Sequence, residues 1–123
     1  MTTEHDEQAA FCEWMLMQHP EVLFYSHPNG AWLAGNKGQR IGQVNKLKRE
    51  GMLPGVSDLF IAEPRGEFHG MYLEMKRPGG EVSENQLWFL DQAEQRGYFT
   101  AVAANGFDDA KSSTEWYLSL PRS

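Results

Sequence analysis

Apolar and polar residues follow one another along the chain at spacings that predict helices and short strands in turn. Helical spacing, with Pro, Gly and capping signals at the ends, predicts helices over residues 4–18, 41–50, 83–97 and 108–120. Short β-like runs predict strands over residues 22–27, 57–62, 70–76 and 98–104. This order of elements predicts an α/β fold with a small mixed β-sheet flanked by α-helices.

The helical pattern also predicts which side chains face the core. Trp and Phe residues at helical spacing are typical of core positions. The inward residues are expected to include Phe11, Met15, Val44, Leu47, Leu90, Ala110, Trp116, Tyr117 and Leu120, and Trp88 is expected to broaden the apolar side of its helix. Between the elements, Pro28-Asn29-Gly30 predicts a turn, and the Gly-rich residues 31–40 predict an ordered loop.

The strands at 57–62 and 70–76 are expected to form an antiparallel hairpin, because Pro64 and Gly66 lie between them. If the turn centres on Gly66, Asp58 lies directly opposite Glu74. A slip of one residue would move Asp58 to the other face of the sheet, so the register is part of the prediction.

Composition limits the class of protein. The chain has 123 residues, 41% hydrophobic and 23% charged, which is enough for one domain, residues 1–123, and argues against a disordered chain. No apolar run approaches the roughly 18 residues of a membrane span, and the acidic start does not resemble a secretory signal. Cys12 is the single cysteine, which excludes an intrachain disulfide and a cysteine-ligated zinc site. We therefore expect a cytoplasmic protein.

Positive charge is concentrated in one segment of an acidic chain, whose formal net charge is -6. Within residues 31–52, five basic residues stand against a single acid, Glu50. The basic residues are Lys37, Arg40, Lys46, Lys48 and Arg49. They indicate either a solvated helix face or a patch for phosphate contacts, which position a nucleic acid without reading its sequence.

Asp58 and Glu74 are candidate metal ligands. Two carboxylates within a few Å of each other repel unless a cation lies between them, and hard oxygen ligands with open water positions suit Mg²⁺ or Mn²⁺. Lys76 is expected on the same face of the strand as Glu74. There it would orient or deprotonate a metal-bound water and neutralise charge during phosphodiester hydrolysis. The alternative is a surface ion pair between Glu74 and Lys76, with Asp58 as a cap at the strand start.

Two motifs carry a resemblance to known nucleases. Gly55-Val56-Ser57-Asp58 followed by Leu73-Glu74-Met75-Lys76 resembles the PD-(D/E)xK signature, with Ser57 where many members have Pro. More narrowly, the chain resembles the VRR-NUC family. This resemblance adds four further features in the same order: residues 50–59, the Pro78-Gly79-Gly80 turn, the Ser83-x-x-Gln86 helix start and Gly97-Tyr98. The resemblance covers nearly the whole chain and implies one restriction-endonuclease-like domain.

By position, the resemblance implies that Asp58 and Glu74 bind the metal, with the backbone carbonyl of Met75 as a further ligand. Lys76 matches the catalytic lysine. Gln86 matches a glutamine that lies near the site, and its capping role is compatible with that position.

A glutamate from the first helix often reaches the metal in such nucleases, usually through water. Glu4 is the candidate because it shares a helical face with Phe11 and Met15, and Glu7 is the alternative. His27 begins another stretch that resembles the family, where it either contacts the site or belongs to a plain turn.

The preferred function is a Mg²⁺- or Mn²⁺-dependent DNA endonuclease. It is expected to select branched DNA or junctions, because nothing in the sequence resembles a base-reading helix. Similar stand-alone domains, many of them phage-encoded, suggest a homodimer in the cytoplasm of a bacterial host. The alternatives are a non-catalytic DNA-binding or scaffolding module that keeps the fold, and a small acidic protein that binds a host partner.

Overall fold

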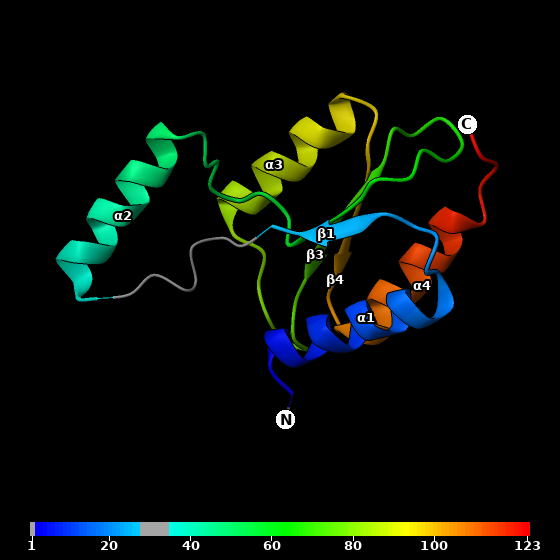
Figure 1. Ribbon diagram of the computed structural model, residues 1–123, viewed down its shortest axis with the longest axis horizontal. Coiled ribbons are helices and arrows are strands. Elements are labelled where there is room, and N and C mark those ends of the chain that lie inside the picture. Colours follow the sequence, from blue (N-terminus) through cyan, green and yellow to red (C-terminus); the bar gives the residue numbers. More distant parts are fainter. Residues whose placement is uncertain (1, 28–34) are drawn as a thin grey trace.

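The computed structural model describes residues 2–27 and 35–123 of the chain. The helices are α1 (Glu4–Gln18), α2 (Lys37–Arg49), α3 (Glu84–Gln95) and α4 (Phe107–Leu118). The strands are β1 (Phe24–Ser26), β2 (Leu59–Ile61), β3 (Met71–Met75) and β4 (Phe99–Ala103). This arrangement confirms the predicted α/β fold with a small mixed sheet (Figure 1). The predicted turn at 28–30 and residues 31–34 of the predicted loop lie outside the described residues, whereas residues 37–40 of that loop belong to α2.

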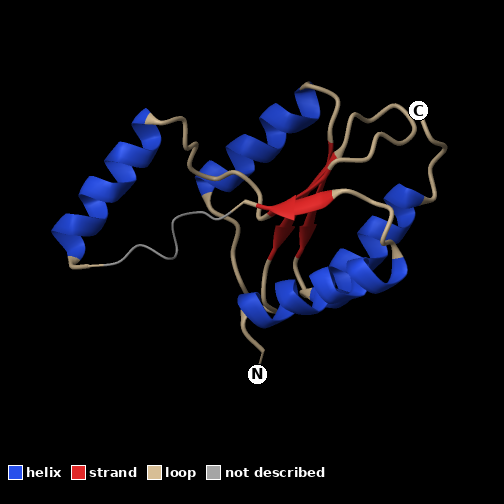
Figure 2. Ribbon diagram, viewed as in Figure 1, coloured by secondary structure: helices blue, strands red, loops and turns tan. Residues whose placement is uncertain are grey.

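The four strands lie side by side in sequence order. β1 pairs with β2 and β2 with β3 in antiparallel fashion, whereas β3 and β4 are parallel. A parallel pair needs a crossover, and α3 makes it over one face of the sheet. α1 and α4 cover the opposite face, so the sheet is the middle layer of three (Figure 2).

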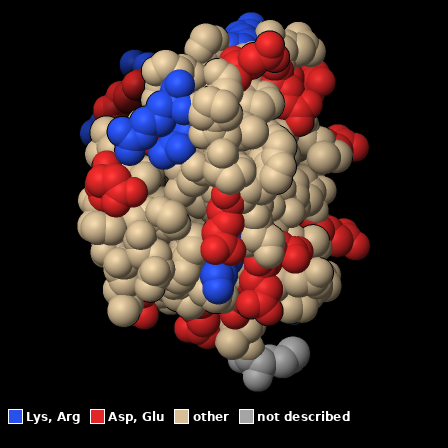
Figure 3. Space-filling model, turned by 90° about the vertical axis from the view of Figure 1, so that its right-hand side faces the viewer, with Lys and Arg blue, Asp and Glu red and all other residues tan. Residues whose placement is uncertain are grey.

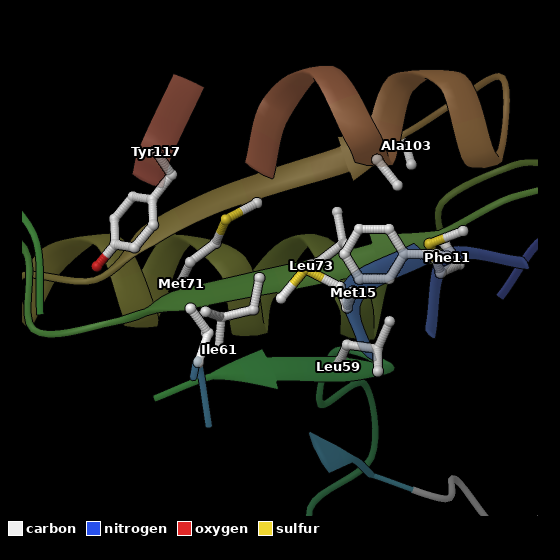
Figure 4. Close-up of a cluster of buried hydrophobic side chains, with 11 residues drawn as sticks. Phe11, Met15, Leu59, Ile61, Met71, Leu73, Ala103 and Tyr117 are labelled. Atoms are coloured by element: carbon white, nitrogen blue, oxygen red, sulfur yellow. The ribbon is translucent and has the colours of Figure 1, made fainter. Parts of the chain in front are cut away.

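The hydrophobic core lies between the sheet and the α1–α4 layer. Alternate residues of β2 and β3 point into it, because successive side chains of a strand face opposite sides. Phe11 and Met15 from α1 and Tyr117 from α4 meet these strand residues (Figure 4). The fully buried hydrophobic residues of these two strands are Leu59, Ile61, Met71, Leu73 and Met75.

The other face of the sheet is aromatic and lies beneath α3. The rings of Phe60 and Tyr72 are 4.6 Å apart, and Tyr72 lies 5.0 Å from Phe89 on α3 and 5.3 Å from Tyr98. The catalytic candidates of β3 belong to this face, because Glu74 follows Tyr72 by two residues.

α2 differs from its prediction in two ways. It begins at Lys37, four residues before the predicted start, because Asn36 and Gln39 form a capping box. None of its side chains is buried, so the expectation that Val44 and Leu47 face the core is wrong. Lysine and arginine share the surface of Val44, and packing that surface into a core would bury unpaired charge. α2 therefore lies beside the body of the molecule (Figure 1).

Two further expectations about inward residues need correction. Trp116 is 51% exposed, because the buried positions of α4 are Ala110, Thr114 and Tyr117, which share one helical face. Trp88 on α3 is likewise 52% exposed, although its helical spacing is typical of core residues. In the described part of the chain, no helix has the length and apolarity needed to cross a membrane.

Candidate active site

The hairpin register brings the two acidic candidates together. Leu59 pairs with Leu73, and the same ladder continued by one step sets Asp58 opposite Glu74, as the sequence predicts. Asp58 lies just before β2, and its Oδ2 accepts a hydrogen bond of 2.8 Å from the backbone N–H of Met75. This bond fixes the Asp58 side chain against the end of β3. His27 is its neighbour on the other side, donating its backbone N–H to the Asp58 carbonyl at 2.7 Å.

The loop before Asp58 is held against the start of α3. Gly55 has a φ of +90°, a conformation that L side chains rarely adopt, and a Cβ at this position would overlap the carbonyl oxygen of Asn85. The close approach connects the loop that carries Asp58 to the helix that carries Gln86. A glycine at this position is therefore a steric requirement of the site.

Glu74 is the most deeply buried acid of the site. The residue is 0% exposed, and its Oε1 accepts a hydrogen bond of 2.8 Å from Gln86 Nε2. The Oε1 of Gln86 also accepts the Ser83 backbone N–H at 2.8 Å, so Gln86 caps α3 and contacts the site at once. Lys76, 7% exposed, places its Nζ 3.8 Å from Glu74 Oε1. The Glu74–Lys76 contact, which the sequence left open as a surface ion pair, is therefore buried.

Burial raises the pKa of Glu74 to about 9, with the charge of Asp58 and a hydrogen bond to Asp58 as the next causes. The charge of Lys76 lowers this pKa, but does not outweigh the other effects. The second oxygen, Oε2, is buried and has no hydrogen-bond donor in the described residues. A buried carboxylate oxygen without a donor, next to a second carboxylate, fits a divalent cation.

The described residues hold no group of three or more His, Cys, Asp or Glu side chains that could ligate a metal. The donors available are therefore the Asp58 and Glu74 carboxylates and backbone oxygens such as that of Met75. Two carboxylates leave coordination positions for water, which is the ligand set that Mg²⁺ favours.

The two glutamates of α1 have different surroundings. Glu7 accepts the backbone N–H of Phe107 at 2.9 Å, so its carboxylate is engaged at the start of α4. Glu4 lies close enough to the site for its charge to raise the pKa of Glu74, as the smallest of the causes. The geometry therefore favours Glu4 over Glu7 as the α1 acid of the site.

All five basic candidates lie on α2 and are exposed. They do not form one stripe. Lys37, Arg40 and Lys48 border one shallow depression, together with Ile41 and Val44, whereas Lys46 borders another. On the right-hand side of the molecule, away from α2, acidic side chains are spread across the surface (Figure 3).

Sequence reasoning missed two features next to the site. The steric contact between Gly55 and Asn85 joins residues far apart in the sequence, and no local pattern indicates it. An aromatic pocket beside Tyr72 was also missed, because helical spacing alone places Trp88 in the core. Only the structure shows that Trp88 is exposed, as is the hydrophobic Leu87 before it.

The fold and the carboxylate–lysine site together define a nuclease-type domain. Comparison with protein families matches residues 2–105 to the VRR-NUC domain, so the chain belongs to the VRR-NUC family. A solved structure described as a VRR_NUC domain protein superposes with a TM-score of 0.81 at 24% sequence identity. The match covers 99% of this chain and 93% of that one, and it supports the fold. No protein of curated function matches the chain.

Proposed function

We propose that this protein is a divalent-metal-dependent DNA endonuclease. The observation that carries the proposal is the buried Glu74, which lies opposite Asp58 and is contacted by both Lys76 and Gln86. A structural role alone does not account for this group, because burying an acid and a lysine beside the half-buried Asp58 is unfavourable unless their charges are used.

Asp58, Glu74 and the Met75 carbonyl would hold Mg²⁺ or Mn²⁺, with Glu4 acting through water. A cation held there lowers the pKa of a bound water and offsets charge on the phosphate. Gln86 keeps Glu74 oriented through Oε1. Lys76 Nζ would donate a hydrogen bond to a phosphate oxygen and stabilise the charge that develops there as a water oxygen bonds to phosphorus and the P–O bond to the leaving group breaks; the leaving oxygen takes up a proton from solvent.

α2 supplies the contacts to the DNA backbone in this proposal. Its exposed lysines and arginines suit phosphates, and such contacts carry no sequence information. We therefore expect selection of DNA structure, such as branches or junctions. A homodimer would double the basic surface and present two sites to two strands. A phage-encoded enzyme of this kind would act in the cytoplasm of its bacterial host.

The first experiment is cleavage of supercoiled plasmid, linear duplex and a four-way junction, with Mg²⁺ and then with Mn²⁺. We expect the wild type to cut and Lys76→Ala to lose cleavage, with the junction cut fastest. Binding to the junction without cleavage under any condition would favour the non-catalytic module instead.

Metal binding is tested separately by thermal unfolding. Ligand that binds the folded state raises its stability by about 1.4 kcal/mol for each tenfold excess over Kd. We expect 10 mM Mg²⁺, added to EDTA-treated protein, to raise the melting temperature of the wild type, and Asp58→Ala to lose this response. Asp108→Ala, which removes an exposed acid of α4, is the matched control and should respond like the wild type. Equal responses from both variants would contradict the assigned site.

A further inference from the structure

A pocket of about 290 Å³ lies beside the candidate active site, between α3, the aromatic face of the sheet and the loop after α2. Four aromatic rings form most of its wall, and an amide and a guanidinium provide its polar groups. The lining residues are Leu53, Tyr72, Trp88, Phe89, Gln92, Ala93, Arg96 and Tyr98. The volume is at the lower end of the range for small-molecule sites.

Trp88 is the most exposed aromatic residue of this wall, at 52%, and Leu53, which also lines the pocket, is 41% exposed. A ligand that covered this apolar surface would gain free energy, because burial of apolar surface is favourable. A flat aromatic ligand is a suitable occupant, because ring faces favour offset-stacked or edge-to-face partners.

The polar side of the pocket is already ordered. Arg96 Nη1 donates to the side-chain Oε1 of Gln92 at 2.8 Å and to its backbone carbonyl at 3.0 Å. These bonds hold the exposed guanidinium at the pocket without further loss of rotamer freedom. A positive charge placed there suits a ligand that carries phosphate next to its aromatic ring.

The pocket and the candidate active site share two elements. On β3, Tyr72 precedes Glu74 by two residues on the same face, about 7 Å along the strand. On α3, Gln86 holds Glu74, and Phe89, one helical turn later, contacts the Tyr72 ring. The loop that contributes Leu53 follows the basic end of α2 directly. The pocket is therefore built on the same strand and helix as the candidate site, and on the loop that leads from α2 towards Asp58.

We propose that this pocket binds the base of an unpaired nucleotide next to the cleaved phosphate, with Trp88 as its stacking platform. This inference rests on the proposed function, since it concerns the DNA that the nuclease acts on. It provides a physical reason for structure selectivity. Paired bases remain stacked in the duplex, whereas an unpaired base at a branch or flap can enter the pocket without loss of pairing.

The test is a binding assay on full-length Lys76→Ala protein in EDTA, so that no cleavage occurs. Two labelled DNAs are compared, a blunt duplex and the same duplex with a single-stranded flap. Trp88→Ala is introduced into this background, with Trp116→Ala as the matched control. Trp116 is 51% exposed and packs on Phe99, which belongs to the opposite face of the sheet. Circular dichroism and melting temperature establish that both variants are folded.

We expect Trp88→Ala to weaken binding of the flap DNA about 5- to 150-fold, the range for removal of one stacked base. Binding of the blunt duplex should change less than about twofold, and Trp116→Ala should affect neither DNA. Trp88→Phe should restore most of the flap affinity, whereas Trp88→Leu should not, because leucine keeps the apolar surface and lacks the ring.

Equal affinity of Trp88→Ala and its parent for the flap DNA would overturn the pocket assignment. So would a change of oligomeric state on Trp88→Ala in sedimentation, because the pocket would then contact protein. The two proposals fail separately. If wild-type protein cuts DNA while Trp88 has no effect on binding, the nuclease stands without the pocket. If Trp88-dependent flap binding occurs without any cleavage, the pocket stands without the nuclease.

Discussion

Charged residues occur in two contrasting settings in this protein. At the end of the hairpin, Glu74 and Lys76 are buried and each contacts a defined partner. Along α2, lysines and arginines are exposed on a helix that buries none of its side chains. The first setting is unfavourable for folding, and the second has almost no effect on it.

The difference shows what each group of charges can be used for. Burial and Asp58 raise the pKa of Glu74, so its charged form is unfavourable until a cation replaces the proton, and the position of the side chain is fixed by its neighbours. Exposed charges on a helix face suit contacts with a mobile phosphate backbone. The two regions should therefore respond differently to the same kind of substitution.

The largest expected effect is the loss of cleavage on Lys76→Ala. Removing one donor that stabilises transition-state charge reduces turnover by about 100- to 1000-fold. We expect at least a 100-fold decrease in the rate under single-turnover conditions with saturating Mg²⁺. Arg77→Ala, the adjacent exposed basic residue, should stay within about threefold of the wild type. Similar decreases in the cleavage rate for Lys76→Ala and Arg77→Ala would mean that the buried lysine has no special role in cleavage.

The second prediction concerns the backbone that holds Asp58. Gly55 and Gly51 both have positive φ, at +90° and +105°, but only at Gly55 would an added Cβ meet another part of the protein. Gly51→Ala should reduce the free energy of unfolding by about 1 kcal/mol through backbone strain, and Gly55→Ala by about 2–4 kcal/mol. Urea unfolding measures both. Gly55→Ala should also weaken Mg²⁺ binding, because the loop leading to Asp58 would move. Identical stabilities would indicate that the loop does not depend on its contact with α3.

The third prediction follows from the raised pKa of Glu74, which burial and Asp58 move from 4.5 to about 9. Between these values the folded protein holds a proton that the unfolded chain has lost. The metal-free protein should therefore become less stable as pH rises through this window, by at most about 1.4 kcal/mol per pH unit from this group.

Glu74→Gln isolates this contribution, because the amide keeps the shape and does not titrate. Thermal unfolding in EDTA at pH 5.5, 6.5 and 7.5 should give a steeper loss of stability for the wild type than for the variant. Parallel pH profiles would mean that Glu74 is ionised in the folded metal-free protein.

The fold and the site could be predicted from sequence where short-range patterns determine them. Alternation within the hairpin and a turn centred on Gly66 sufficed for the register that pairs Asp58 with Glu74. The Ser83–Gln86 capping box sufficed for the start of α3.

Features that depend on distant parts of the chain were not predictable in this way. Helical periodicity identifies an apolar face but does not show whether another element covers it, so it places Trp88, Trp116 and Val44 in the core. The choice between Glu4 and Glu7 depends on the start of α4, about 100 residues further along the chain. The early start of α2 is a different case, because the capping box of Asn36 and Gln39 was present in the sequence.

The smallest expected effect is the change in stability when lysines of α2 are replaced. It distinguishes the exposed charges of α2 most directly from the buried charges at the hairpin. In the Lys46→Gln, Lys48→Gln double variant, the free energy of unfolding should change by less than about 0.5 kcal/mol, because neither side chain is buried. DNA affinity should nevertheless fall, and the slope of log Kd against log salt should decrease by about 1 for each phosphate that the variant no longer binds. Lys111→Gln, on α4 over the Trp14 ring, removes a charge of the same type from a different face and should leave this slope unchanged. An unchanged slope in the double variant would mean that DNA binds a surface other than α2, and the basic helix would then be a solvated face.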